Sequence, residues 1–219
     1  MILTNPILLK KKEQFDAIYL NLHRDIRAHC THVGIVTGVM SRNHEDRFSG
    51  EYGLYGSVLN MAILRGGDYH DIGKHLLSYA ICRKTDRLNQ TEQEIIRRHP
   101  RYTVQLLTEY ADVLFENEGA TQIAIDMGLY HHERSDGSGY PSGLEGEEIP
   151  FLPQLCILAN FLDEAVGHRR GDTFDTVAKQ ILKNKNGWFS PGALLCFDQN
   201  LDEIRKLYTS KYSWLTTNA

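Results

Sequence analysis

Apolar residues recur at steps of three and four along most of the chain, and this spacing constrains the fold more than any other feature. Near the start, Phe15, Ile18, Leu22 and Ile26 are spaced as one face of an amphipathic helix. Further runs of this kind end at glycine, proline or polar segments, and no stretch shows the alternation expected of a half-buried strand. The pattern therefore predicts an all-α protein, built as a bundle of helices.

The composition of the 219 residues is that of an ordinary globular protein. Apolar residues make up 42 % of the chain, which is enough for a sizeable core. The net charge of −4 and the lack of a long basic run argue against a nucleic-acid polymer as partner. Four cysteines are scattered without a CxxC pair, and no apolar run approaches the roughly 18 residues of a membrane span. We therefore expect a cytoplasmic protein with reduced thiols and no membrane segment.

Two segments predict their own secondary structure from their residues alone. In "TEQEIIRRHP" (91–100), Thr91 and Glu94 have the spacing of a capping box, which predicts a helix that begins there. The stretch "DGSGYPSGLEGEEIP" (136–150) holds four glycines and two prolines, which predicts a loop between two helices.

Histidine and aspartate side chains recur at the ends and on the apolar faces of the expected helices. Taken singly, each can be a hydrogen-bonded core residue or a cation at a helix end. Taken together, imidazole and carboxylate groups without cysteine suit iron, manganese or zinc in hydrolytic sites. An Asp beside a His can bridge two metal ions, and adjacent histidines on a helix point about 100° apart, so they can wrap a two-metal centre. The residues concerned are His32, His70, Asp71, His99, His131 and His132.

The stretches "HDIGK" (70–74), "HP" (99–100) and "HHERSDGSGYPSGLEGEEIP" (131–150) together resemble an HD-GYP domain. This is the subgroup of the HD phosphohydrolase superfamily that hydrolyses cyclic dinucleotides, chiefly cyclic di-GMP. The resemblance covers roughly residues 28–200, and its last block is the most specific. It implies an HD-domain helical bundle at residues 28–219, preceded by an N-terminal helical extension at residues 1–27.

The resemblance also implies roles for individual residues, each placed by its position in these motifs. The family's lysine falls at Lys74 and its loop tyrosine at Tyr140, which would face the substrate. Arg169 or Arg170 would contact substrate phosphates. The cofactors implied are two divalent metal ions, iron or manganese. Their ligands would be His32, His70, Asp71, His99, His131, His132 and Asn160.

Two positions depart from the family pattern. Some members carry a glutamate one turn before the first histidine and hold a third metal, and that position is Ala28 here, which favours two ions. The last ligand of the family is normally an aspartate, and Asn160 stands in its place. An amide oxygen can ligate a metal but is neutral and a poorer donor than carboxylate, so one metal position should be weakened. Asp163, one turn later, is the alternative ligand if the helix is shifted.

The function implied is hydrolysis of cyclic di-GMP, with Asp71 bridging the ions and Lys74 stabilising charge on the phosphate. Two alternatives remain open. One is a receptor or scaffold that binds a cyclic dinucleotide or a protein partner without turnover, and Asn160 is the feature that raises it. The other is a hydrolase of a different nucleotide phosphate. The stretch before residue 28 is too short for a sensor domain, so regulation by a homodimer or a partner protein is expected.

Overall fold

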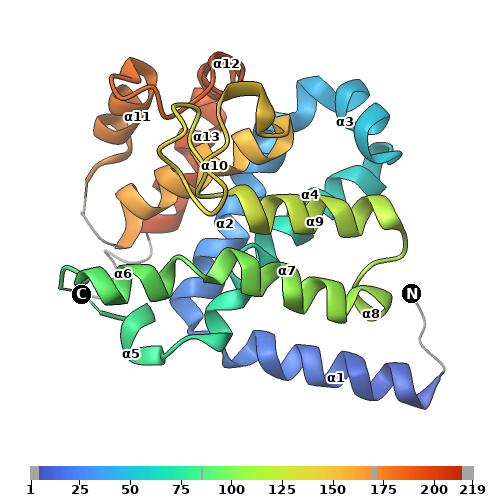
Figure 1. The fold of residues 1–219 in the computed structure, drawn as a ribbon. Helices are drawn as coiled ribbons and strands as arrows, with labels where there is room; N and C mark the ends of the chain where they lie inside the picture. The colour runs from blue at the N-terminus through green and yellow to red at the C-terminus, as the bar shows by residue number, and fades with distance from the viewer. Residues whose placement is uncertain (1–4, 85, 169–171, 214–219) are drawn as a thin grey trace.

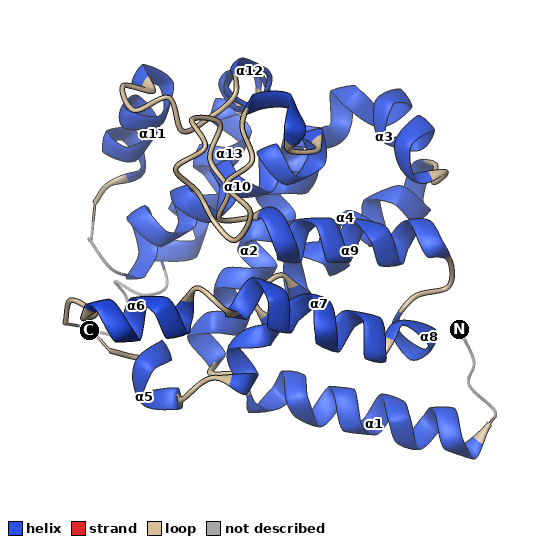
Figure 2. Ribbon diagram, viewed as in Figure 1, coloured by secondary structure: helices blue, strands red, loops and turns tan. Residues whose placement is uncertain are grey.

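The computed structural model describes residues 5–84, 86–168 and 172–213, and every regular element within these ranges is helical (Figure 2). The all-α prediction is therefore confirmed. The α-helices are α1 (Pro6–Asn21), α2 (Arg24–Ser41), α3 (Glu45–Tyr52), α4 (Gly56–Tyr69), α5 (Tyr79–Cys82), α6 (Gln90–Ile96), α7 (His99–Glu109), α8 (Ala111–Leu114), α9 (Glu118–Tyr130), α10 (Phe151–Asp163), α11 (Phe174–Lys183), α12 (Pro191–Gln199) and α13 (Leu201–Ser213). Shorter elements are the 3-10 helices η1 (Arg42–His44), η2 (Ile72–Leu76) and η3 (Gly146–Glu148), and the π-helix η4 (Glu164–His168).

Helices α2, α4, α9 and α10 form the centre of the bundle. Helix α2 packs against both α4 and α10, and α9 packs against α4, α7 and α10. Figure 1 shows α1 along the lower edge, with α11 and α12 at the opposite end. Helix α10 is apolar on nearly all sides and almost every residue in it is buried, as expected of a helix surrounded by others. The ends of these central helices meet, and the polar residues that they carry are brought together there.

Two glycines set the distance between α2 and α4. A Cβ atom built on Gly67 would lie 2.1 Å from the Cα of Gly34, which no side chain could tolerate. The two backbones are therefore in direct contact at this crossing. Since Gly34 follows His29 by five residues and Gly67 precedes His70 by three, this close approach fixes the separation of the two histidine-bearing segments.

The N-terminal helix belongs to the same core. Phe15 on α1 is fully buried, and its ring packs against those of Tyr69 and Tyr110 at centroid distances of 5.2 and 5.4 Å. Helix α1 ends at Asn21, so the prediction that Ile26 continues its face is wrong. The side chain of His23 accepts the backbone N–H of Asp25 and begins α2 instead. The boundary expected between residues 27 and 28 falls within α2.

The capping box was predicted two residues too late. The helix before "HP" begins after Asn89, whose side chain accepts the N–H of Glu92, while the Glu92 carboxylate accepts the N–H of Asn89. Asn is as good an N-cap as Thr, and this pair has the same three-residue spacing, so the pattern alone did not separate the two choices. None of the helices in the described ranges is long and apolar enough to cross a membrane.

Candidate metal centre

Histidines from four helices converge at one place in the bundle. His29 comes from the first half of α2, and His70 and Asp71 follow the last residue of α4. His99 begins α7, whereas His131 and His132 directly follow α9. All of these residues except His29 therefore lie at helix ends, where chain direction changes and polar groups are tolerated.

The rings of three histidines are oriented by the same hydrogen bond, from Nδ1 to the backbone carbonyl three residues earlier. The Nδ1 atom of His70 donates to the carbonyl of Gly67 at 2.7 Å, and that of His99 donates to Ile96 at 2.6 Å. His131 repeats the contact with a carbonyl three residues earlier, that of Gly128, at 3.0 Å. A backbone acceptor at Nδ1 fixes the tautomer with its lone pair on Nε2. All three Nε2 atoms are thereby available as ligands.

The possible ligand atoms form two groups that share Asp71. One group is Asp71, His99, His131 and His132, and the other is His29, His70 and Asp71; within each, the ligand atoms lie within 4.8 Å of one another. The Oδ1 atom of Asp71 lies 3.0 Å from Nε2 of His99 and 3.5 Å from Nε2 of His131. Its Oδ2 atom lies 3.6 Å from Nε2 of His70 and 3.9 Å from Nε2 of His29. Each carboxylate oxygen thus faces one group.

The protonation states suit metal binding. Burial lowers the pKa of His70 and of His132, and it lowers that of His99 to about 4, so these rings are neutral near pH 7. Burial alone would raise the pKa of Asp71, but the positive charge of Lys74 and the surrounding histidines together outweigh it and hold the pKa well below its usual value. Neutral imidazoles around an ionised carboxylate are the ligand-competent forms.

Two buried atoms at this centre have no hydrogen-bond partner among the described residues, Nε2 of His70 and Oδ1 of Asp71. Both side chains are at most 1 % exposed. Leaving buried polar atoms unsatisfied costs free energy, unless a group outside the chain completes them. Together with the His/Asp donor set, which suits iron, manganese or zinc, these orphaned atoms fit a divalent metal ion.

The first histidine at the centre is His29, which the sequence reasoning missed. Its Nδ1 atom donates to Oδ2 of Asp163 at 2.7 Å, and its Nε2 atom lies 2.9 Å from Oδ1 of Asn160. His32, one turn later, lies outside both groups, with Nδ1 3.0 Å from Asp163 Oδ1 and its ring against Tyr208. The position one turn before His29 is Asp25, so Ala28, from which two ions were expected, is not the residue at that position.

Asn160 and Asp163 occupy different places around His29. Asn160 is buried, and its amide oxygen faces the same nitrogen of His29 that faces Asp71. Asp163 is fully buried on the other side of the ring, where Tyr208 also donates its hydroxyl to Oδ1 at 3.1 Å. The alternative ligand Asp163 thus lies outside both groups and instead orients His29.

The glycine-rich loop is held by a buried carboxylate. Glu133 is fully buried, and its two oxygens accept the backbone N–H groups of Ser142, Gly143 and Leu144 at 2.7, 3.0 and 3.2 Å. The loop is thereby folded back so that the ring of Tyr140 stacks on that of His132, 4.6 Å between centroids and 20° between planes. Tyr140 is joined to the next residue by a cis peptide bond.

A cavity of about 470 Å³ opens beside the His29 group. His29, Asp71 and Lys74 line its inner wall, and the Lys74 ammonium donates to Asp71 Oδ2. The cations Arg83, Lys84 and Arg87 line the cavity as well. Its mixed charge suits an anionic ligand with polar groups, such as a nucleotide phosphate. The predicted phosphate contacts Arg169 and Arg170 lie outside the described residues.

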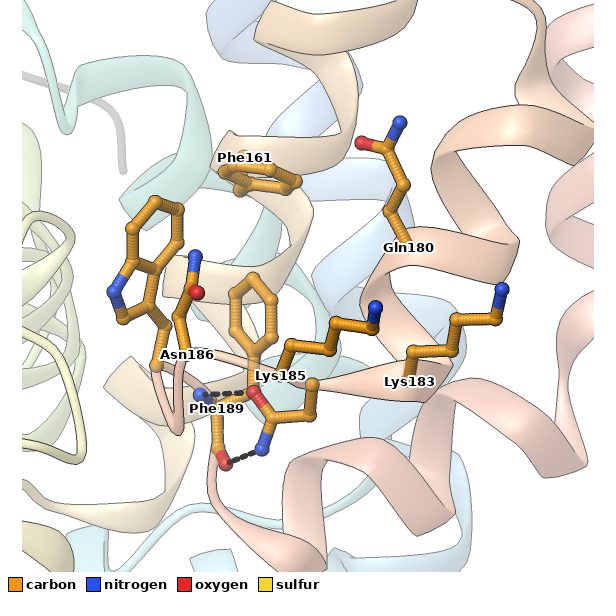
Figure 3. A pocket seen from close by; sticks show the side chains of 8 residues that line it. Phe161, Gln180, Lys183, Lys185, Asn186 and Phe189 are labelled. Atoms are coloured by element: carbon orange, nitrogen blue, oxygen red, sulfur yellow. Dashed lines mark hydrogen bonds between the residues drawn. The ribbon is translucent and has the colours of Figure 1, made fainter.

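A second cavity, of about 380 Å³, lies between α10, α11 and the segment before α12 (Figure 3). Phe161, Trp188 and Phe189 form its aromatic wall, and Lys183 and Lys185 line it too. Trp188 also contacts the residues just before the glycine-rich loop. The guanidinium of Arg134 lies 3.7 Å from the Trp188 ring centroid, and the carbonyl of Trp188 accepts the N–H of Ser135 at 2.9 Å.

The sequence model of the HD domain family matches residues 67–191, more than half of the chain. The chain therefore belongs to the HD domain family, which confirms the resemblance drawn from the motifs. It is similar to the 3'3'-cGAMP-specific phosphodiesterase 2 of Vibrio cholerae, with 29 % identity over 163 residues that cover 73 % of this chain and 30 % of the relative. A cyclic di-GMP phosphodiesterase of Thermotoga maritima is 31 % identical over 194 residues, covering 86 % of this chain and 49 % of the relative. This chain thus spans half or less of the length of these relatives.

Solved structures agree on the fold. Bd1817, described as an HDG"Y"P protein from Bdellovibrio bacteriovorus, has a TM-score of 0.61 and 17 % identity, covering 90 % of this chain and 60 % of that one. The HD domain of the Listeria monocytogenes phosphodiesterase PgpH, solved with cyclic-di-AMP, has a TM-score of 0.51 and 16 % identity, covering 96 % and 100 %. At these identities the likeness establishes a shared helical fold.

Proposed function

We propose that this chain is a metal-dependent phosphodiesterase that hydrolyses a cyclic dinucleotide, cyclic di-GMP, by adding water across one of its phosphodiester bonds. The observation that carries the proposal is the placing of Asp71, with one oxygen toward His99 and the other toward His70. A carboxylate so placed can be shared by two ions. The relatives named as cGAMP and cyclic di-GMP phosphodiesterases support this substrate class.

The ligands divide between two divalent ions, iron or manganese. Asp71, His99, His131 and His132 would hold one ion. His29, His70, Asp71 and Asn160 would hold the other, with His29 in the place that motif matching gave to His32. The grouping of the ligand atoms and the 2.9 Å between His29 and Asn160 support this division.

When bound, two such ions would supply Lewis acidity and would lower the pKa of a water molecule enough for attack at neutral pH. Lys74 lies at the cavity wall and stays protonated: burial lowers the pKa of its ammonium, but the carboxylates of Asp71 and Glu164 outweigh that effect and raise it. Its charge stabilises the negative charge that develops on the phosphate oxygens. Tyr140, whose ring stacks on that of His132, remains a predicted substrate contact. Arg83 and Arg87 line the cavity and offer further positive charge for phosphate. Arg169 and Arg170 remain predicted phosphate contacts.

The test is metal analysis of anaerobically purified protein, combined with hydrolysis of cyclic di-GMP in Fe²⁺ or Mn²⁺. We expect about two metal ions per chain and turnover that the paired change His70→Ala/Asp71→Ala abolishes. Less than one ion per chain together with no turnover would contradict the proposal. A panel with 3'3'-cGAMP, cyclic di-AMP, linear dinucleotides and mononucleotides then separates cyclic di-GMP hydrolysis from action on another nucleotide phosphate.

Asn160 favours a second candidate function, a receptor that binds a cyclic dinucleotide without turnover. The amide is neutral and sits where it faces His29 Nε2. Replacing Asn160→Asp separates the candidates. An enzyme with a weakened ion gains activity on this change, whereas a receptor stays inactive in both forms while still binding the ligand.

We also infer a setting in the bacterial cytoplasm with a homodimer or regulatory partner. The four cysteines are free, which suits a reducing compartment, and the relatives come from bacteria. Light scattering of the purified protein during gel filtration tests the homodimer directly.

A further inference from the structure

The His29 and His70 side of the metal centre has no carboxylate ligand of its own among the described residues. In the part of the chain that the structure describes, the His29 and His70 group includes one carboxylate, that of Asp71, which it shares with the other group. Asn160 adds an oxygen without charge. Oxygen donors bind divalent ions more strongly when they are charged. Since Asn160 is neutral and Asp71 is shared, an ion at this position has no carboxylate ligand that belongs to it alone.

Glu164 stands one turn beyond Asn160 on the same side of the helix. It is the C-cap residue of α10, and its backbone N–H donates to the carbonyl of Asn160, so helical geometry continues to this point. Residues four apart on a helix lie above one another on one face. The side chain of Glu164 accordingly lines the same cavity as His29, Asp71 and Lys74.

The carboxylate of Glu164 is unpaired within the part of the chain that the structure describes. It is half-buried, and no hydrogen bond or ion pair engages it among residues 5–84, 86–168 and 172–213. Its charge is close enough to contribute to the raised pKa of Lys74, alongside the larger effect of Asp71. Glu164 also begins the π-helix η4, and such local changes in helix geometry are frequent at functional sites.

Asp163, the neighbouring acid on α10, is already engaged. Both oxygens of Asp163 are occupied, Oδ2 by His29 and Oδ1 by His32 and Tyr208. Asp25 and Asp86 also line the cavity, but both are open to solvent: the side chain of Asp25 is about half exposed, with Oδ1 3.5 Å from Nε of Arg24, and Asp86 is exposed.

We propose that Glu164 supplies the negative charge that Asn160 lacks, and so strengthens the binding of the divalent ion on the His29, His70 and Asp71 side. The carboxylate is thereby moved one turn along α10 from the position where the family normally carries it. This inference rests on the metal centre of the proposed function. It adds to that centre a residue that the motifs do not mark.

The experiment measures Mn²⁺ binding to metal-free protein by titration calorimetry, without substrate. Glu164→Gln removes the charge at nearly constant shape, and Glu109→Gln removes an exposed charge on α7 as the matched control. We expect Glu164→Gln to weaken one of two Mn²⁺ sites roughly tenfold or more. Glu109→Gln should bind as the unaltered chain does. Circular dichroism verifies that both variants are folded.

A second background tests whether Glu164 replaces the missing carboxylate. With Asn160→Asp in place, Glu164→Gln should weaken the site much less, because the charge has been restored one turn earlier. Unchanged Mn²⁺ affinity in Glu164→Gln would overturn the inference, and so would an equal loss in both backgrounds. If the unaltered chain hydrolyses cyclic di-GMP in either of those cases, the proposed function stands. If the unaltered chain binds no Mn²⁺, both proposals fail.

Discussion

The Oδ2 atom of Asp163 accepts a hydrogen bond from Nδ1 of His29 at 2.7 Å, and this contact turns the other nitrogen of the ring toward Asp71 and Asn160. A carboxylate behind a ligating imidazole fixes the ring's orientation and increases its basicity. Replacing Asp163→Asn should therefore weaken Mn²⁺ binding at the His29 position about 10–100-fold, while the other position is less affected. Calorimetric titration measures this, with the exposed Asp198→Asn as control. Equal affinities in both variants would show that Asp163 does not position His29.

The two histidines of α2 should respond differently to replacement. His29→Ala should lose one of the two ions, because His29 Nε2 belongs to a ligand group. His32→Ala should keep both ions and lose about 1–3 kcal/mol of stability, because it removes a hydrogen bond to a buried carboxylate. Metal content by mass spectrometry and urea unfolding measure the two effects. The reverse result would restore the ligand role to His32.

Glu133 should control the glycine-rich loop rather than the metal ions. Glu133→Gln replaces one of two acceptor oxygens with an amide donor that faces backbone N–H groups. We expect a loss of about 1–3 kcal/mol of stability and a higher KM for the cyclic dinucleotide, with metal content unchanged. Glu147→Gln, an exposed change in the same loop, is the control. If KM stays the same, the loop does not line the substrate cleft.

The stability of the metal-free protein should depend on pH. His70, His99 and His132 have lower pKa values in the folded protein than the ordinary value of 6.5. Below pH 6.5 the unfolded chain therefore binds more protons than the folded chain, and stability falls as the pH decreases toward about 4, the pKa of His99. The shift of His99 alone corresponds to about 3 kcal/mol, so we expect these three histidines together to cost at least that much stability over this interval.

Part of that pH dependence is opposed by His29. Burial lowers its pKa, but the hydrogen bond and charge of Asp163 outweigh burial, so the pKa is raised, and the stability that this adds is lost at higher pH. Urea unfolding in chelator at several pH values gives the net slope. His99→Gln should make the slope shallower, and an unchanged slope would show that His99 is not held neutral.

Contiguous motifs allowed most of the centre to be predicted from the sequence. "HDIGK" and the paired histidines 131 and 132 sit at helix ends, and the structure brings them together with His99. His29 was missed because it and His32 are three residues apart on one helix, and spacing alone does not distinguish them. The contacts that separate them come from Asn160 and Asp163 on α10, more than 120 residues along the chain.

The roles of two acidic residues, Glu133 and Glu164, were also not predicted from the sequence. Glu133 lies within the quoted block, yet nothing in a sequence distinguishes an acid that accepts three backbone N–H groups from one in solvent. Glu164 carried no motif at all. Both roles depend on how segments pack together, which local periodicity does not determine.

The proposed function depends above all on a two-ion centre shared through Asp71. The most direct measurement adds Mn²⁺ stepwise to metal-free protein while cyclic di-GMP hydrolysis is followed at each step. We expect about two ions to bind per chain, with turnover rising mainly with the second equivalent. Full turnover with a single ion, or two bound ions in an Asp71→Ala variant that hydrolyses as well as the unaltered chain, would contradict it.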